Sequence, residues 1–260
     1  MALTRHPQGW VRQFHRPADP NNPLLLVFPH AGAGASAYRA LSKALSERFD
    51  VVIFQYPGRQ DRAGEPALLS LPEIAAGAFE DFQAAGHRPG APIMTFGHSM
   101  GGLVSFEFAR LAQERGVAVP QLVVSAAIAP CRAAEKPSHP TGDEEILDHL
   151  GRLEGTDTAI FANRDLMRAA LPAIKGDYQA FDAYSCAEGV KVSSRVHVLG
   201  GDADPVVTMR DLYDWDKHAD DVQVTVFSGG HFYLNEHMDA LSRLLVEAAQ
   251  GQQAGTGAAR

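Results

Sequence analysis

Ile93-Met-Thr-Phe-Gly-His-Ser-Met-Gly-Gly102 is the stretch that decides the fold. Its first four residues are mostly apolar and predict a buried strand, and a segment with helical periodicity, Leu103–Arg115, follows directly. Between the two lies Gly97-His-Ser-Met-Gly101, which matches G-x-S-x-G. At a strand-to-helix turn this motif is typical of a nucleophile elbow, because small residues beside the serine permit a sharp turn. Ser99 is therefore the candidate nucleophile. The alternative is a glycine-rich turn that carries a surface serine.

Outward from this motif, short apolar runs alternate with segments of helical periodicity. We expect strands at Leu24–Phe28, Val51–Phe54, Ile93–Phe96, Leu122–Ser125, Val196–Leu199 and Val222–Phe227. We expect helices after Tyr38 and at Leu71–Ala85, Leu103–Arg115, Thr208–Ala219 and Met238–Ala249. This alternation favours an α/β fold, with a mostly parallel central sheet flanked by helices on both faces.

The alternation stops at Asp143–Tyr184, where helical patterns follow one another without a convincing strand. This segment is interpreted as a helical insertion into the α/β core. We expect a single domain over residues 1–260, with its core at 20–130 and 190–250 and the helical insertion at 135–188. The small and polar residues 251–260 predict a disordered tail.

A serine hydroxyl needs a base, and the nucleophile elbow predicts the chain order Ser, then Asp or Glu, then His. His231 follows the last expected strand in a Gly-Gly-His turn and is the candidate base, whereas His197, His218 and His237 fall in expected helices or a strand. Gly200-Gly-Asp-Ala-Asp-Pro205 offers two acids. We favour Asp204, because the proline that follows it holds the chain extended, and assign Asp202 to a turn or cap.

An acyl-transfer site also needs N–H donors aimed at the developing oxyanion. Met100, directly after the nucleophile, supplies one, and the loop after the first expected strand supplies the other, with Ala31 favoured and Gly32 next. The same loop fits a relaxed dinucleotide-binding fingerprint. That reading requires an acid at the end of the next strand, where this chain has Gln55 and Tyr56, so nucleotide binding is not favoured.

Composition and charge exclude several classes of protein. The chain has 260 residues, 45% of them hydrophobic, and a formal net charge of −8, which argues against nucleic-acid binding. Cys131 and Cys186 are its two cysteines and cannot form a disulfide framework or a thiolate zinc site. No signal peptide or membrane-spanning run is evident, so we expect a cytoplasmic protein without membrane contacts, metal or cofactor.

Other polar residues receive structural interpretations. Arg59 and Arg62 are interpreted as surface charges, with anion binding as the alternative. Asp211, Asp214 and Asp216 crowd one helical stretch and are expected to form a solvated face. His30 and His98 flank the site in sequence and are expected to be structural.

In the candidate site residues named above, the chain resembles the type II thioesterases of polyketide synthase and nonribosomal peptide synthetase pathways. These enzymes belong to the α/β-hydrolase superfamily. The resemblance extends to about Ala249. It rests on five ordered blocks: Phe28-Pro-His-Ala-Gly32, Gln55-Tyr-Pro-Gly-Arg-Gln-Asp-Arg62, Gly97-His-Ser-Met-Gly101, Gly200-Gly-Asp-Ala-Asp-Pro205 and Gly229-Gly-His231. The Tyr-Pro-Gly-Arg block is the most distinctive, because ordinary esterases do not usually carry it.

The resemblance implies an α/β-hydrolase fold with a helical lid and the catalytic residues Ser99, Asp204 and His231, with Met100 and Ala31 as oxyanion donors. It also implies hydrolysis of aberrant or stalled acyl groups from the phosphopantetheine arm of acyl or peptidyl carrier proteins. We expect the protein to be a monomer. The competing hypotheses are a general carboxylesterase, a product-releasing or cyclising thioesterase, and a catalytically inactive hydrolase fold that serves as a binding module.

Overall fold

A seven-stranded sheet runs through the computed structural model, which describes residues 9–86, 91–154 and 164–256. The strands are β1 (Val11–Arg12), β2 (Leu24–Phe28), β3 (Asp50–Phe54), β4 (Ile93–His98), β5 (Gln121–Ser125), β6 (Arg195–Gly201) and β7 (Val222–Phe227). Their order in the sheet is β1-β3-β2-β4-β5-β6-β7, and every neighbouring pair is parallel except β1 with β3. All the predicted strands are present, and β1 is an additional edge strand.

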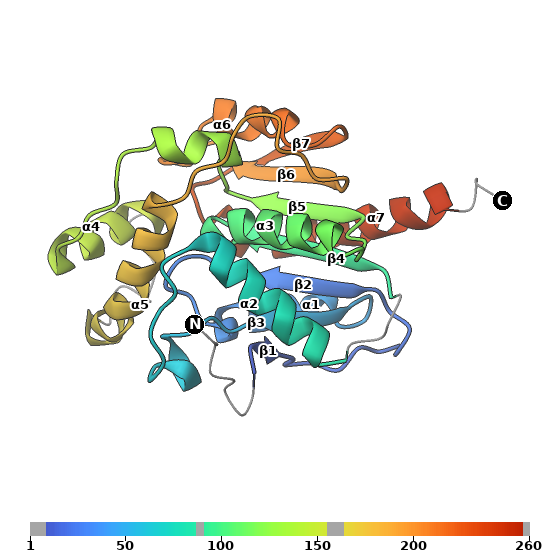
Figure 1. Ribbon diagram of the computed structural model, residues 1–260, viewed down its shortest axis with the longest axis horizontal. Helices are drawn as coiled ribbons and strands as arrows, with labels where there is room; N and C mark the ends of the chain where they lie inside the picture. The colour runs from blue at the N-terminus through green and yellow to red at the C-terminus, as the bar shows by residue number, and fades with distance from the viewer. Residues whose placement is uncertain (1–8, 87–90, 155–163, 257–260) are drawn as a thin grey trace.

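Helices cover both faces of this sheet (Figure 1). They are α1 (Arg39–Leu45), α2 (Leu71–Ala84), α3 (Met100–Glu114), α4 (Asp143–Glu154), α5 (Arg164–Asp182), α6 (Met209–Tyr213) and α7 (Met238–Thr256). In β2, Leu24, Leu26 and Phe28 belong to the core beneath α2 and α3, whereas Leu25 and Val27 belong to the core beneath α1 and α7. Because both faces are buried, the strand is apolar throughout rather than alternating, which made it recognisable in the sequence.

Helices α4 and α5, together called the two-helix insertion, lie between β5 and β6 in the chain. Figure 1 shows them beyond the carboxyl ends of the parallel strands. They have an apolar cluster of their own, formed by Ile146, Leu147, Leu171, Ile174 and Tyr178, and Ala31 of the loop after β2 packs against it. The two-helix insertion therefore covers the carboxyl ends of the parallel strands, where the predicted site residues lie.

Three helix ends differ from the sequence expectation. The helix expected at Thr208–Ala219 is shorter, because α6 ends at Tyr213 and a 3-10 helix, Asp214–Lys217, follows it. Helix α3 begins at Met100 rather than Leu103, because the turn at Ser99 leads directly into the helix in spite of the low helix propensity of two glycines. Helix α7 continues through residues 251–256, which belong to the predicted disordered tail, and Gln252, Gln253 and Ala254 are good helix formers. Residues 257–260 lie outside the described residues. Over the described ranges, no helix has the length and apolar character to cross a membrane.

Candidate active site

Ser99 occupies the turn between β4 and α3 in a backbone conformation that L residues rarely adopt. Its φ is 54° and its ψ is −124°, and its N–H donates a hydrogen bond to the carbonyl oxygen of Ser125 at 2.7 Å. Such strained geometry persists only where surrounding contacts enforce it, and it is frequent at functional sites. The turn lifts the serine side chain out of the sheet.

Glycines make this turn possible because other backbone segments occupy the space of a side chain. A Cβ atom on Gly97 would lie 2.1 Å from the carbonyl oxygen of Gly101. A Cβ atom on Gly101 would lie 2.0 Å from the carbonyl oxygen of Phe28 and 2.7 Å from that of Pro29. The start of α3 is thus packed directly on the loop that follows β2.

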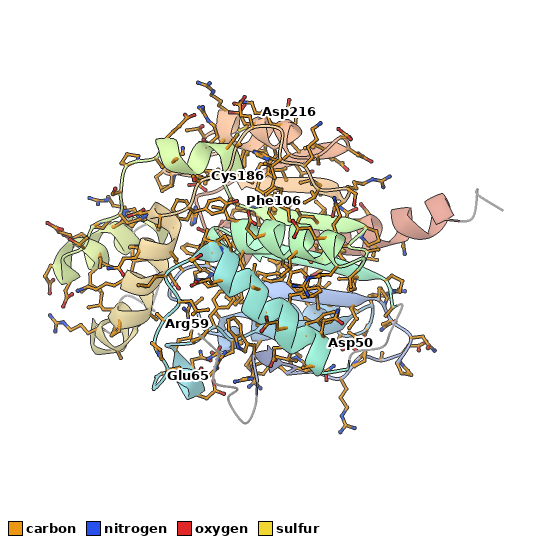
Figure 2. All side chains as sticks on the ribbon, viewed as in Figure 1. Asp50, Arg59, Glu65, Phe106, Cys186 and Asp216 are labelled. Atoms are coloured by element: carbon orange, nitrogen blue, oxygen red, sulfur yellow. The ribbon has the colours of Figure 1, made fainter. Side chains whose placement is uncertain are left out.

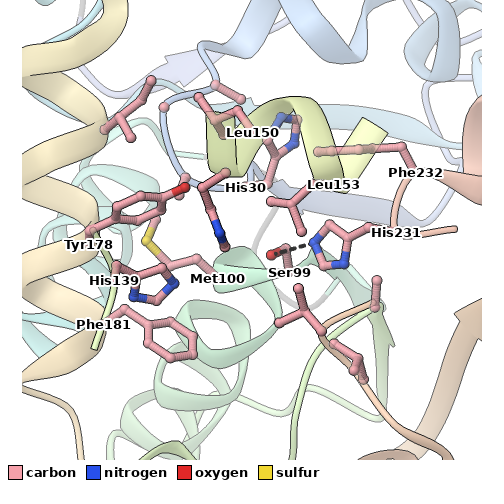
Figure 3. A pocket seen from close by; sticks show the side chains of 18 of the residues that line it. His30, Ser99, Met100, His139, Leu150, Leu153, Tyr178, Phe181, His231 and Phe232 are labelled. Carbon is pink, nitrogen blue, oxygen red and sulfur yellow. Dashed lines mark hydrogen bonds between the residues drawn. The ribbon is translucent and has the colours of Figure 1, made fainter. Parts of the chain in front are cut away.

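Ser99, His231 and Asp204 form a continuous hydrogen-bonded chain. His231 Nε2 lies 2.9 Å from Ser99 Oγ, and His231 Nδ1 lies 2.8 Å from Asp204 Oδ2 (Figure 3 shows the first of these bonds). The His231 and Asp204 side chains are 3% and 1% exposed. The other carboxylate oxygen of Asp204 accepts hydrogen bonds from the N–H groups of Val206 and Val207, at 2.8 and 3.1 Å. These bonds orient the acid toward the imidazole.

Asp202, the alternative acid, has no hydrogen bond to His231 among those found in the described residues. It is exposed, and its Oδ1 accepts a hydrogen bond from the N–H of Gly229 at 2.9 Å. The structure therefore brings Asp204 rather than Asp202 to the imidazole.

The two expected oxyanion donors belong to residues that line the cavity at Ser99. Met100 is the first residue of α3, so its N–H is among the four that have no carbonyl partner within the helix. Ala31 and Met100 line the same cavity as Ser99. Gly32, the alternative to Ala31, donates its N–H to Asp177 Oδ2 at 2.7 Å. That bond occupies the Gly32 amide and favours Ala31 as the second donor.

His30 and His98 are buried beside His231 and are bonded to other groups. Burial, with smaller contributions from His231 and Arg59, lowers the pKa of His30 to about 3, and its Nδ1 lies 2.8 Å from the Tyr38 hydroxyl. Burial also lowers the pKa of His98 well below its usual value, and its Nδ1 lies 2.9 Å from Ser125 Oγ. Both rings are therefore neutral near pH 7 and serve as packing partners, since each contacts the Phe232 ring.

The remaining histidines that the sequence set aside are bonded elsewhere. His197 Nε2 lies 2.8 Å from Thr225 Oγ1, His218 Nδ1 lies 2.8 Å from the carbonyl oxygen of Val190, and His237 Nε2 lies 2.8 Å from that of Ser228. None of the hydrogen bonds found in the described residues joins these three rings to Ser99.

A cavity of about 1010 Å³ opens at Ser99. Figure 3 shows the reacting groups facing the side chains of the two-helix insertion. That insertion contributes mainly apolar and aromatic side chains to the lining, including Leu150, Leu153, Ile174, Tyr178 and Phe181. A mainly apolar chamber of this size can enclose an apolar ligand.

The interpretation of Arg59 and Arg62 as surface charges is wrong. Both are buried, and Arg59 lies inside the molecule near α5 (Figure 2). Its guanidinium makes a bidentate ion pair with Asp177 of α5, with N–O distances of 2.7 and 2.8 Å. Arg62 donates to Glu65 at 2.7 Å and to the carbonyl oxygen of Gln55 at 2.8 Å. Sequence reasoning missed Asp177, since nothing local marks its partner 118 residues away.

The expected solvated face of three aspartates is only partly present. Asp216 is exposed at the surface (Figure 2). Asp211 is buried, caps α6 through Thr208 and pairs with Lys136 at 2.6 Å. Asp214 pairs with Arg132 at 3.1 Å. Within the residues that the structure describes, no cluster of His, Cys, Asp and Glu is suited to hold a metal ion.

Comparisons with known proteins agree with this geometry. Residues 23–248 match the family model described as "Thioesterase domain". Phenyloxazoline synthase MbtB of Mycobacterium tuberculosis is 40% identical over 238 residues, which make up 91% of this chain and 16% of that protein. The chain thus spans only 16% of the length of this relative. Thioesterase PikA5 of Streptomyces venezuelae is 38% identical over 87% of this chain and 80% of its own length.

Among solved structures, the type II thioesterase BorB from the borrelidin biosynthetic cluster is similar with a TM-score of 0.80 and 40% identity. The match covers 92% of this chain and 95% of BorB. The sheet order and this likeness confirm the predicted α/β-hydrolase fold.

Proposed function

Because the chain belongs to the thioesterase domain family, we propose that it hydrolyses acyl thioesters held on the phosphopantetheine arm of carrier proteins. Its task would be to remove aberrant or stalled acyl groups during polyketide or nonribosomal peptide synthesis, and so return a free thiol to the carrier. The observation that carries this proposal is the Ser99–His231–Asp204 chain of hydrogen bonds at the opening of a large apolar cavity.

The first chemical step would form an acyl-enzyme. His231 Nε2 takes the proton of Ser99 as Oγ bonds to the thioester carbonyl carbon, and the carbonyl electron pair moves to oxygen. The N–H groups of Met100 and Ala31 donate hydrogen bonds to that oxyanion. When the intermediate collapses, the carbon–sulfur bond breaks, and the departing pantetheine sulfur takes the proton from His231.

The second step would release the acid. His231 removes a proton from water, the water oxygen bonds to the acyl carbon, and the bond to Ser99 Oγ breaks as His231 returns the proton to the serine. Asp204 holds the imidazole in the required tautomer and stabilises its charged form throughout, without taking the proton.

We further propose that the two-helix insertion acts as the lid of the acyl chamber within a single-domain enzyme. Its support is the lining of the cavity by α4 and α5 and the packing of their apolar cluster on Ala31. Substitutions in this lining, such as Leu150→Ala, should change the preferred acyl length while leaving the hydrolysis of a short acetyl thioester nearly unchanged.

Turnover of matched substrates tests the proposed function. Acyl groups of several lengths are presented as carrier-protein thioesters and as p-nitrophenyl oxygen esters, and free thiol or phenol is measured. We expect a higher kcat/KM for the carrier thioesters than for the oxygen esters. Ser99→Ala should show no turnover above background with either substrate. A clear preference for oxygen esters would instead indicate a general carboxylesterase.

A product-releasing role is the second candidate, and the likeness to a segment of a much longer synthase favours it. It predicts that the enzyme acts on the completed chain and releases it as a defined acid or ring. Mass analysis of the products from a mixture of completed and stalled carrier-bound chains separates the two roles, since the editing role predicts preferential removal of the stalled groups.

A further inference from the structure

The buried ion pair between Arg59 and Asp177 contacts the loop that carries the second proposed oxyanion donor. Arg59 belongs to the Tyr-Pro-Gly-Arg block after β3, and Asp177 belongs to α5. Their side chains are 4% and 0% exposed. Asp177 Oδ2 accepts hydrogen bonds from Arg59 Nη1 and from the N–H of Gly32, both at 2.7 Å. One carboxylate oxygen thus joins three segments of the fold.

Helix α5 also limits the space around this loop. Gly32 has a φ of +75°, and a Cβ atom there would lie 2.4 Å from Cγ1 of Ile174. Ile174 and Asp177 are separated by nearly one helical turn, so they lie on the same face of α5. One side chain therefore packs against Gly32 while the other accepts its hydrogen bond.

These contacts restrict the peptide group that contains the Ala31 N–H. The carbonyl of that peptide, His30 C=O, accepts a hydrogen bond from the N–H of Ala33 at 3.1 Å. In a trans peptide the N–H points opposite to the C=O, so this bond turns the Ala31 N–H away from the inside of the turn. The preceding peptide is held by the Tyr38 hydroxyl, which accepts from the His30 N–H at 3.3 Å, and the following one by Asp177.

We propose that Arg59 and Asp177 are positioning residues for the oxyanion hole. The hole forms correctly only while α5 is packed on the loop after β2 that contains Ala31 and Gly32. The inference rests on the proposed function for the roles of Ser99 and Ala31. It gives the Tyr-Pro-Gly-Arg block a role in orienting Asp177, since Arg59 holds both of that carboxylate's oxygens. Its guanidinium is held in turn by the carbonyl oxygen of Pro57 and lies 5.1 Å from the centre of the Tyr56 ring.

Three variants test the proposal. Arg59→Met combined with Asp177→Leu replaces both charges with apolar groups of similar volume, which avoids leaving one charge buried alone. Asp177→Asn preserves the shape and one acceptor oxygen. Lys175→Met is the matched control, because Lys175 lies on the same helix and pairs at the surface with Asp143, at 2.5 Å. Thermal unfolding verifies that each variant is folded.

The readouts are kcat and KM for an acyl thioester, and inhibition by the matching trifluoromethyl ketone. In the inhibited enzyme, Ser99 Oγ bonds to the ketone carbon, its proton moves to His231, and the ketone oxygen becomes an oxyanion in the hole. For the double variant we expect kcat to fall about 10²-fold, as when one oxyanion donor is lost. Its KM should change less than about threefold, and ketone affinity should weaken in parallel with kcat.

Asp177→Asn should lose about tenfold in kcat, and Lys175→Met should match the wild type within about twofold. A folded double variant with wild-type kcat, a change in KM alone, or unchanged ketone affinity would overturn the proposal. If the wild type cleaves oxygen esters and not thioesters, the proposed substrate is wrong. The same comparison made with the ester then still decides whether Arg59 and Asp177 position the hole.

Discussion

The Asp202 carboxylate accepts a hydrogen bond from the N–H of Gly229 at 2.9 Å, and this bond joins the loop that carries Asp204 to the loop that carries His231. A second bond, from the N–H of Ala203 to the carbonyl oxygen of Gly229 at 2.9 Å, reinforces the junction. Gly201 permits this approach, because a Cβ atom there would lie 2.4 Å from the carbonyl oxygens of Gly229 and Gly230. The acid and the base are thus aligned by their backbones as well as by their own hydrogen bond.

Asp202→Ala should therefore lower kcat without abolishing activity. The bond from Ala203 remains, but the loop of His231 gains freedom, and small misalignments of catalytic groups reduce rates strongly, so we expect a loss of about tenfold. Steady-state kinetics measure the effect. Asp216→Ala, an exposed aspartate outside this junction, is the control and should retain wild-type kcat.

Asp204→Asn should lower kcat by about 10⁴-fold with little change in fold. The asparagine oxygen can still accept from Val206 and Val207, but its amide group would donate to His231 Nδ1 and impose the wrong tautomer. Steady-state kinetics and circular dichroism of the purified variant provide the measurement. A comparable loss of kcat in Asp202→Asn would argue against Asp204, rather than Asp202, as the acid that acts with His231.

Gly101→Ala should destabilise the protein by about 1–3 kcal/mol and abolish most activity, because the new methyl group would overlap the backbone of the loop after β2. Gly151→Ala, in α4, is the matched control. A Cβ atom at Gly151 would point into open space, so the same substitution there should stabilise the helix by about 0.5–1 kcal/mol. Urea unfolding of both variants tests the contrast, and equal effects would contradict it.

The free energy of unfolding should fall as the pH decreases below about 6.5. Burial lowers the pKa of His197 from 6.5 to about 4 and that of His30 to about 3. Between these values and 6.5 the unfolded chain binds protons that the native protein does not, so acid favours unfolding. The stability from each histidine is complete above its unfolded pKa and is lost as the pH falls toward its folded pKa.

His197→Gln isolates one of these contributions outside the active site. Each such histidine contributes a slope of at most about 1.4 kcal/mol per pH unit between its two pKa values. The variant should therefore show a shallower decline in unfolding free energy between pH 6.5 and pH 4 than the wild type, each compared with its own value at pH 8. An unchanged slope in urea titrations would show that His197 is protonated in the native state as readily as in the unfolded chain.

The sequence was informative wherever local pattern and topology determine structure. Strands buried on both faces appear as apolar runs, as in β2, and parallel strands place their carboxyl ends at one edge of the sheet. Chain order could therefore predict that Ser99, Asp204 and His231 converge. Strand β1 was missed because it comprises only Val11 and Arg12, too short for a periodic pattern.

Long-range polar pairing could not be predicted in the same way. Nothing near Arg59 identifies Asp177 as its partner, and an arginine in a turn is usually exposed. Lys136 and Asp211, which are likewise distant in sequence, form a contact that only the folded chain reveals. The Tyr-Pro-Gly-Arg block, which best distinguished the family in the sequence, thus makes contacts that only the structure reveals.

The most direct test of the central claim is intact-mass detection of an acyl group on Ser99. Wild-type enzyme is mixed with acylated carrier protein, quenched in acid after milliseconds to seconds, and analysed by mass spectrometry with peptide mapping. The proposed mechanism predicts a transient mass increase equal to the acyl group, located on Ser99, absent from Ser99→Ala and depleted as free acid forms. Hydrolysis of the carrier thioester by Ser99→Ala at the wild-type rate would contradict it.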